Sequence, residues 1–253
     1  MILHWTMAVL LMVGMETMVR SDNMPADNLS PEAIFKKAQD AYDSLTSYSD
    51  KGKTVDINNS MLHAPLPHFD ANTDTFTVTH LDNVTFITTF TTKLARPNLY
   101  RVEWEQEPPA ELLQGGAKPD KGIVWSTGEG DFWDIGNGPE KQKDQYSALT
   151  GKNGNSGGAT YGIPGAFFKL GYNNPLKALG PNLKRTADEK VGGSDCYVLS
   201  TDGTINKTLW IGKQDFLLRQ IRSVTTGETG GTITETHSDI VVNQKFLPKD
   251  FTP

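Results

Sequence analysis

Apolar and polar residues alternate in LYRVEWEQ, where Tyr100, Val102 and Trp104 share one side of the alternation. Successive side chains of a β-strand point to opposite faces, so this pattern predicts a strand with one buried and one solvated face. Similar runs follow Tyr48 along the chain: FITTFTTKL, GIVWS, FWDIG, CYVLS, TLWIG and TITETHSDIVV. Turn signals such as STGEGD, VGGSD and IGKQD separate neighbouring runs by hairpin-length gaps, which favours an antiparallel sheet.

A helix is predicted before the first of these strands, in the stretch NLSPEAIFKKAQDAYDSLTSY. Ser30 is a suitable N-cap, and Pro31 suits the first helical position. Apolar residues then recur at helical spacing from Ile34 to Leu45, which predicts one face packed against the sheet.

The middle of the chain, GKNGNSGGATYGIPGAFFKLGYNNPLKAL, is a Gly-rich loop that leads into two short apolar segments. The first starts at Pro164, and the second has Asn174 as cap with Pro175 at its first helical position. Their apolar residues are Phe167, Phe168, Leu170, Leu176 and Leu179. Each is worth roughly 1.5 to 3 kcal/mol when buried, so we expect them on the inner side of a curved sheet.

These elements predict an α+β fold. A long antiparallel sheet preceded by one helix tends to curl into a strongly curved, open half-barrel, and its concave side then has to be filled. The chain has 253 residues and no Pro-rich or charge-rich linker. We therefore expect one domain, residues 24–253, after an apolar leader at residues 1–23.

The leader predicts export. Its apolar stretch from Trp5 to Met15 matches a signal-peptide core and is shorter than the ~20 residues of a membrane span. No Lys or Arg precedes the stretch and no A-x-A site follows it, so an uncleaved anchor stays open as the alternative. With cleavage, the mature chain would start between Asp22 and Asp27, in the periplasm or cell envelope.

Charge and cysteine content narrow the possible partners. The net charge of −6 argues against nucleic acid and against an anionic membrane surface, because both favour a basic face. The one cysteine, Cys196, cannot form an internal disulfide, and its place in DCYVLS predicts a strand residue rather than a reactive thiol.

Several stretches resemble a known family when they are taken in order: LARPNLYRVEWEQ, GIVWSTGEGDFWDIGNG, YGIPGAFFKL, KTLWIGKQDFLLRQIR and SDIVVNQKFLPKDFTP. Together they look like the periplasmic outer-membrane lipoprotein carriers, the LolA-like family. The resemblance covers most of the chain after Leu29, and RPNLY is its most specific element.

The resemblance implies a half-barrel in which the N-terminal helix and short internal helices form a lid over a hydrophobic cavity. It also implies an exported carrier of lipid acyl chains, with lipoproteins as one candidate cargo, that works as a monomer with envelope delivery and acceptor proteins. Three segments are longer than the carrier's equivalents: INNSMLHAPLPHFDANTDTF, PPAELLQGGAKPDKG and the Gly-rich loop. The identity of the cargo therefore stays open.

Arg96 matches the arginine that, in this family, hydrogen-bonds to lid elements and holds the empty cavity shut. From its position alone, an arginine before a proline is also typical of a solvated turn. The residues expected to bind ligand or form the lid are Arg96, Tyr100, Val102, Trp104, Phe167, Phe168, Leu170 and Trp210.

Two stretches of the sequence resemble metal sites, but neither predicts one. Asp70, Asn72 and Asp74 resemble the start of a calcium loop, but Thr75 and Leu81 replace its glycine and its bidentate glutamate. For zinc, three histidines fall in one loop-like insertion without a tight i, i+4 pair. These are His63, His68 and His80.

Catalysis is not predicted either. Glu103 and Glu105 look like paired carboxylates, but the strand alternation places them on the solvated face. The Gly-rich loop lacks the G-K-[ST] ending of a phosphate loop, and G-x-S-x-G, H-E-x-x-H and C-x-x-C are absent from the sequence. We therefore expect no enzyme and no cofactor.

Two non-catalytic alternatives to a carrier stay open. One is an envelope-stress or lipoprotein sensor resembling the periplasmic sigma-factor regulators, which carry a second C-terminal domain where this sequence ends at DFTP. The other is a scaffold whose cavity is filled by its own side chains.

Overall fold

The computed structural model describes residues 27–58, 66–70, 75–79, 84–110, 118–152, 154–171, 174–177, 182–203, 205–227 and 230–253. The leader, with the expected export signal, lies outside the described residues, as does Leu179. Within the described part, no helix is both long and apolar enough to cross a membrane.

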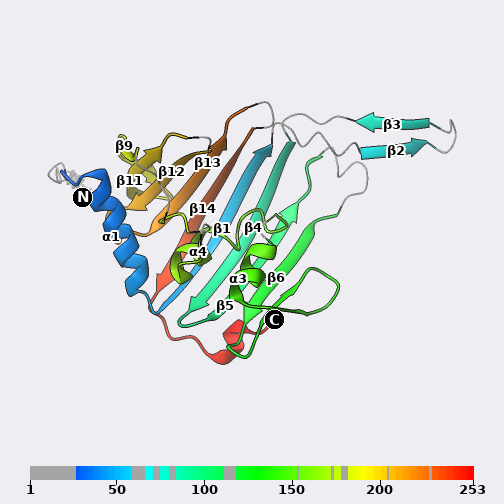
Figure 1. The fold of residues 1–253 in the computed structure, drawn as a ribbon, viewed down its shortest axis with the longest axis horizontal. Helices are drawn as coiled ribbons and strands as arrows, with labels where there is room; N and C mark the ends of the chain where they lie inside the picture. Colours follow the sequence, from blue (N-terminus) through cyan, green and yellow to red (C-terminus); the bar gives the residue numbers. More distant parts are fainter. Residues whose placement is uncertain are drawn as a thin grey trace, which may run out of the picture.

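One open antiparallel sheet of twelve strands dominates the described fold (Figure 1). Its order is β10-β11-β12-β13-β14-β1-β4-β5-β6-β7-β8, with β9 paired to β11. The strands are β1 Ser47–Asn58, β4 Val84–Ala95, β5 Leu99–Glu107, β6 Asp120–Ser126, β7 Asp131–Asp134, β8 Glu140–Gln142, β9 Lys184–Arg185, β10 Glu189–Val191, β11 Ser194–Thr201, β12 Ile205–Gly212, β13 Leu218–Thr225 and β14 Gly231–Val242. Because β8 and β10 end the order without pairing with each other, the predicted open half-barrel is confirmed.

Two further strands, β2 Leu66–Asp70 and β3 Thr75–Thr79, form a separate antiparallel hairpin. Figure 1 shows this hairpin projecting away from the main sheet. It belongs to the long insertion between β1 and β4 that the sequence marked as a departure from the carrier pattern.

Strand β1 joins the C-terminal strands of the sheet to the strands from the first half of the chain. It pairs with β14 on one side and β4 on the other, so that Gly52 lies opposite both His237 and Phe90. The next pairs along this row are Phe90 with Trp104 and Trp104 with Gly122. Residues about 190 positions apart in sequence therefore share one row across the sheet.

The inner face of the sheet carries the alternating apolar residues that the sequence predicted. Tyr48, Leu94, Tyr100 and Val102 are all fully buried. Three helices lie on this face (Figure 1): α1 Pro31–Ser44, α3 Gln145–Gly151 and α4 Gly162–Phe168.

Helix α1 has the predicted start and the predicted buried face. Ser30 Oγ accepts a hydrogen bond from the Ala33 amide at 3.2 Å, and Pro31 is the first helical residue. Ile34, Ala38 and Tyr42 are buried. The Tyr42 hydroxyl accepts from the Leu218 amide at 3.3 Å, which fixes the helix to the start of β13.

Two aromatic rings on the inner face lie flat along the sheet because glycine occupies the neighbouring strand. A Cβ atom on Gly52 would be 1.9 Å from Phe90 Cζ, and one on Gly122 would be 2.1 Å from Trp104 Cζ2. Glycine is thus required for these rings to cover the sheet. Both rings are nearly fully buried.

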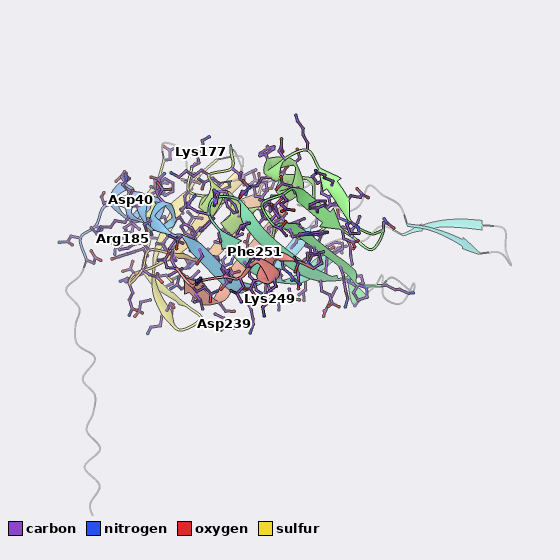
Figure 2. The ribbon with its side chains drawn as sticks, turned by 90° about the horizontal axis from the view of Figure 1, so that it is seen from below. Asp40, Lys177, Arg185, Asp239, Lys249 and Phe251 are labelled. Carbon is purple, nitrogen blue, oxygen red and sulfur yellow. The ribbon has the colours of Figure 1, made fainter. Side chains whose placement is uncertain are left out.

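The C-terminal segment crosses the outer face and ends in the 3₁₀ turn η3 Pro248–Phe251. Arg101, on the outer face of β5, donates to the Thr252 carbonyl, and Phe251 is buried. Figure 2 shows Lys249 and Phe251 close together in this turn, with Asp40 of α1 toward the top of the view and Asp239 of β14 toward the bottom.

Candidate binding site on the concave face

Arg96, between β4 and β5, joins the C-terminal ends of two helices. Its Nε donates to the Leu45 carbonyl at 2.9 Å, and its Nη2 donates to the Tyr42 carbonyl at 3.2 Å and the Phe167 carbonyl at 2.7 Å. The last turn of a helix leaves C=O groups without i+4 amide partners, and of these three carbonyls that of Tyr42 also accepts from the Leu45 amide at 3.3 Å. One guanidinium therefore ties α1 to α4.

The Phe167 side chain completes this junction. The Arg96 guanidinium lies 4.6 Å from the centroid of the Phe167 ring, close enough for a cation–π contact. Phe167 is fully buried. Phe168 packs edge-on against both Phe167 and Tyr100, with centroid distances of 4.9 and 6.1 Å.

The chain leaves α4 through a left-handed residue, Lys169, at φ 58°. Its Nζ forms a 2.9 Å ion pair with Asp43 of α1, at the surface. Leu170 follows and packs against the main core. Asn174 Oδ1 accepts from the Leu176 amide at 2.8 Å, as the predicted cap would, but the described residues 174–177 form a turn rather than a helix.

The Gly-rich loop lies directly on the inner face of the sheet. Gly157, at φ +57°, is so close to β4 that a Cβ atom there would be 2.3 Å from Thr88 Oγ1. At the start of α4, a Cβ on Gly162 would be 2.7 Å from the Glu235 carboxylate oxygens. The loop and α4 thus form one covering element, and we call residues 154–168 the lid segment.

Beneath the lid segment, β1 and β14 bring together a buried charged group. His237 Nδ1 lies 2.7 Å from Asp50 Oδ2, which also accepts from the Tyr48 hydroxyl at 2.8 Å. His237 Nε2 lies 3.2 Å from Glu235 Oε1. The side chains of His237 and Asp50 are fully buried, and that of Glu235 is 8% exposed.

The protonation state of His237 is determined by its burial and by the two carboxyl groups beside it. Burial opposes the charged imidazolium, but the hydrogen bond with Asp50 and the contact with Glu235 outweigh it and raise the pKa of His237 to about 9. Burial, followed by the Asp50 charge, raises the pKa of Tyr48 well above its usual value. His237 is therefore a buried cation at neutral pH.

Several buried polar atoms on this face have no hydrogen-bond partner among the described residues. They include Asp50 Oδ1, Thr54 Oγ1, Thr92 Oγ1 and Trp104 Nε1. Thr54 lies directly opposite Glu235, and Thr92 directly opposite Asp50. The buried polar atoms around His237 are thus only partly satisfied, which is uncommon in folded proteins.

The structure brings seven of the eight expected site residues to one face. Tyr100, Val102 and Trp104 form the floor on β5, the lid segment contributes Phe167 and Phe168, and Arg96 and Leu170 lie at its end. Tyr100 also donates to Asp131 at 2.8 Å.

Trp210 is the exception, and the expectation that it faces the cavity needs correction. Its neighbours Leu209 and Ile211 face the main core, so alternation turns Trp210 to the other face of β12. There it packs with Cys196 and Val198 and donates to Glu189 at 2.8 Å. Cys196 is a buried strand residue, as expected.

The carboxylates of β5 lie on the solvated face, as the alternation indicated. Glu103 pairs with Arg101, and Glu105 pairs with Lys121 at 3.1 Å. They line a shallow groove of about 780 Å³ on the outer side of β4, β5 and β6. Charges of both signs alternate along it.

The metal sites that the sequence did not favour fall largely beyond the described part of the chain. His63, His80, Asn72, Asp74 and Leu81 lie outside it, and so does the side chain of His68. Among the described residues, no group of His, Cys, Asp and Glu is arranged to hold a metal ion.

Two features were missed by the sequence analysis. Helix α3 was not expected, although Asp144 is a good N-cap signal and accepts from the Ser147 amide at 2.7 Å. The Asp50–Glu235–His237 group was not expected because only the β1–β14 pairing brings it together. Glu235 and His237 do share one side of the alternation in TITETHSDIVV, which was the available signal.

Comparison with known proteins gives structural matches only. No protein-family model matches the sequence, and no curated protein matches it. Solved structures that are similar to this chain include the following three, each at low sequence identity. One is a domain described as an outer membrane lipoprotein-sorting protein from Vibrio parahaemolyticus, 12% identical over 88% of this chain and 95% of that chain, with a TM-score of 0.36.

The second is a LolA superfamily protein from Nitrosomonas europaea, 12% identical over 89% of this chain and 98% of that chain, with a TM-score of 0.35. The third is in the MucA/MucB complex of Pseudomonas aeruginosa, 8% identical over 88% of this chain and 60% of that chain, with a TM-score of 0.44. LolA-superfamily and lipoprotein-sorting structures, the family that the sequence resembles, are thus among the matches across most of the chain.

Proposed function

We propose that this protein is an exported carrier or binding protein for lipid acyl chains, which occupy the concave face of the sheet beneath the lid segment. The observation that supports this most is the Arg96 junction. A single side chain holds the lid segment to α1 by hydrogen bonds to three carbonyl groups. Few bonds therefore need to break for the lid segment to lift.

The energies are compatible with exchange of the lid segment for a ligand. Hydrogen bonds from a charged donor contribute roughly 1.5 to 3 kcal/mol each. Burying an acyl chain gains about 0.8 kcal/mol per methylene, or about 12 kcal/mol gross for fifteen methylenes. An acyl chain that takes the place of Phe167 and Phe168 thus offsets the loss of the Arg96 contacts.

The proposal also covers where the protein works and which molecules it meets there. The apolar leader supports export to the periplasm or envelope, where lipoproteins are one possible cargo and delivery and acceptor proteins would be needed. We propose a monomer without a cofactor. The acidic net charge of −6 supports a function without nucleic acid.

A scaffold without a ligand is the second candidate, and the packing of the concave face supports it. Phe90, Trp104 and Phe167 are at most 4% exposed, so the protein's own side chains fill this face in the structure. A carrier in its closed state has the same appearance. Only a binding measurement separates the two.

The test is native mass spectrometry of gently purified protein together with titration of a fluorescent fatty-acyl probe. The carrier proposal expects a lipid bound at one copy per chain, or saturable probe binding that unlabelled dodecanoate displaces. A protein that is always bare and does not bind the probe would support the scaffold. Chemical alteration of the bound lipid would instead indicate an enzyme.

A further inference from the structure

The floor beneath the lid segment contains a buried polar patch, which we define as Asp50, Thr54, Thr92, Glu235 and His237. These residues occupy adjacent inner-face positions on β14, β1 and β4. All five are buried. A cluster of polar groups at the centre of an otherwise apolar face costs free energy unless its hydrogen bonds are completed.

The charges in the polar patch do not balance. Two carboxyl groups, of Asp50 and Glu235, share one imidazole, that of His237. Among the described residues, His237 is the one basic side chain that forms an ion pair with either carboxylate. Arg96 instead donates to backbone carbonyls at the ends of α1 and α4. The patch thus has room for one more positive charge.

Its atoms without a hydrogen-bond partner among the described residues are mostly acceptors. Asp50 Oδ1 and Glu235 Oε1 accept only, and Thr54 Oγ1 and Thr92 Oγ1 can accept as well as donate. The exception is His237 Nε2, a donor in the imidazolium, which lies 3.2 Å from Glu235 Oε1. A group that carries several N–H donors and no acceptor complements such a set, and a primary ammonium is the simplest example.

The lid segment covers this patch without completing its hydrogen bonds. Its amides are used within the segment: Gly157 donates to Gly154, Ala159 to Ser156 and Tyr161 to Gly158. The contact with Glu235 is made by Gly162, which has no side chain to donate. Both ends of the lid segment are held by hydrogen bonds, from Arg96 to Phe167 at one end and from Asn155 to Asp120 at the other. Between them, Gly162 faces the carboxylate of Glu235, whose Oε1 has no hydrogen-bond partner among the described residues.

We infer that the polar patch receives a protonated amine, so that the ligand is a long-chain amphiphile with an ammonium group at its polar end. Lifting the lid segment opens the patch to the ligand, and the ammonium donates to the carboxylates and threonine hydroxyls. The hydrocarbon part then lies along the apolar inner face of β5, where Phe168 packs edge-on against Tyr100 in the closed structure. This inference rests on the proposed acyl-chain binding and specifies the polar end of its ligand.

The experiment is a competition titration with three twelve-carbon ligands that differ only at the polar end: dodecylammonium, dodecanol and dodecanoate. Each ligand is added at pH 7 to displace a fluorescent fatty-acyl probe. The ligand concentrations stay below the micelle concentration or the solubility limit of each ligand. About 0.15 M salt screens the acidic surface, which would otherwise attract the amine without a specific site. We expect dodecylammonium to bind about tenfold more tightly than dodecanol, as charge-assisted hydrogen bonds imply, with dodecanoate weakest.

A variant tests whether the preference for dodecylammonium depends on the polar patch. Glu235→Gln keeps the shape of the side chain and removes one carboxylate, so it should reduce the preference for dodecylammonium over dodecanol to about twofold or less. Glu105→Gln, on the solvated face of β5, is the matched control and should keep the full preference. Thermal melts of all three proteins establish that each is folded.

The wild-type comparison decides the inference even if Glu235→Gln fails to fold. Equal binding of dodecylammonium and dodecanol would overturn it and leave the acyl-chain proposal standing. A preference that Glu235→Gln retains would also overturn it, because the amine would then bind elsewhere. If no ligand displaces the probe, or the probe does not bind, the proposed function and this inference both fail.

Discussion

The Nη2 atom of Arg96 lies 2.7 Å from the carbonyl oxygen of Phe167, two residues before the left-handed cap Lys169 of α4. The same guanidinium bonds to the last carbonyls of α1, so one side chain joins the ends of the two helices. Arginine suits this place because its planar fork presents several donors in fixed directions.

Replacing Arg96 with Leu should open the lid segment without unfolding the sheet. The loss of hydrogen bonds worth roughly 1.5 to 3 kcal/mol shifts the closed-to-open ratio by about tenfold or more. Probe association should become faster by a similar factor, and bound acyl cargo should be retained instead of released. Stopped-flow fluorescence with the fatty-acyl probe measures both rates.

Arg101→Leu is the control for this change, because Arg101 lies on the outer face of the next strand and should leave both rates unchanged. Arg96→Lys should give intermediate rates, since one ammonium group cannot copy the fork to three carbonyls. Wild-type loading and unloading by Arg96→Leu would show that no latch exists, and would leave the cavity part of the proposal intact.

Gly157→Ala should lift the loop end of the lid segment. A Cβ atom there would be 2.3 Å from Thr88 Oγ1, and the residue has φ +57°, a backbone conformation that costs a non-glycine residue about 1 to 3 kcal/mol. Gly154→Ala is the matched control in the same loop, because a Cβ atom there meets nothing within 4 Å. Limited proteolysis of residues 154–168 compares them, and equal cleavage rates in the two variants would contradict the contact with Thr88.

The sequence was sufficient to predict the sheet, the helix at residues 31–44 and the inward face of β5, because these depend on local periodicity. Ser30 and Pro31 fix where α1 begins, and alternation fixes which residues of β5 are buried. The polar patch could not be predicted in this way. Asp50 and His237 are far apart in the chain, and their contact depends on the β1–β14 pairing and on its irregularity after Ser49.

The orientation of Trp210 could not be predicted from the sequence, for a different reason. The pattern of TLWIG does not show which of two buried faces receives the aromatic residue, since Leu209 and Trp210 are both buried. A strand buried on both faces has no polar positions to mark its orientation. The outer cluster of Cys196, Val198 and Trp210 therefore became visible only with the neighbouring strands in place.

Two tryptophan variants should show which face of the sheet binds the fatty-acyl probe. Trp104→Leu removes an indole ring from the floor of the proposed site and should weaken fatty-acyl probe binding by about tenfold or more, as the loss of buried apolar contact implies. Trp210→Leu should leave the dissociation constant unchanged. Both side chains are at most 7% exposed, so the two variants should lose similar stability in urea unfolding. Equal effects on binding would place the acyl site elsewhere.

The buried imidazole should make the protein less stable in mild alkali. The pKa of His237 is raised from 6.5 to about 9 in the folded protein, because Asp50 and Glu235 outweigh the effect of burial. A raised pKa stabilises the folded state fully below the unfolded value, and this contribution is lost as the pH rises from 6.5 through about 9. The free energy of unfolding should therefore fall by about 3 kcal/mol across this window.

Urea unfolding at a series of pH values measures this change, and His237→Gln is the control variant. The variant should be less stable than the wild type at pH 6.5 and should show a nearly flat profile up to pH 9. Tyr48 and Cys196 have raised pKa values, caused chiefly by burial, so each lowers stability only as the pH approaches its usual value of 10.0 or 9.0. Both residues are present in the variant as well, so the difference between the two profiles reports His237. A wild-type profile as flat as that of His237→Gln would mean that His237 is neutral in the fold, and the polar patch would then have no internal cation.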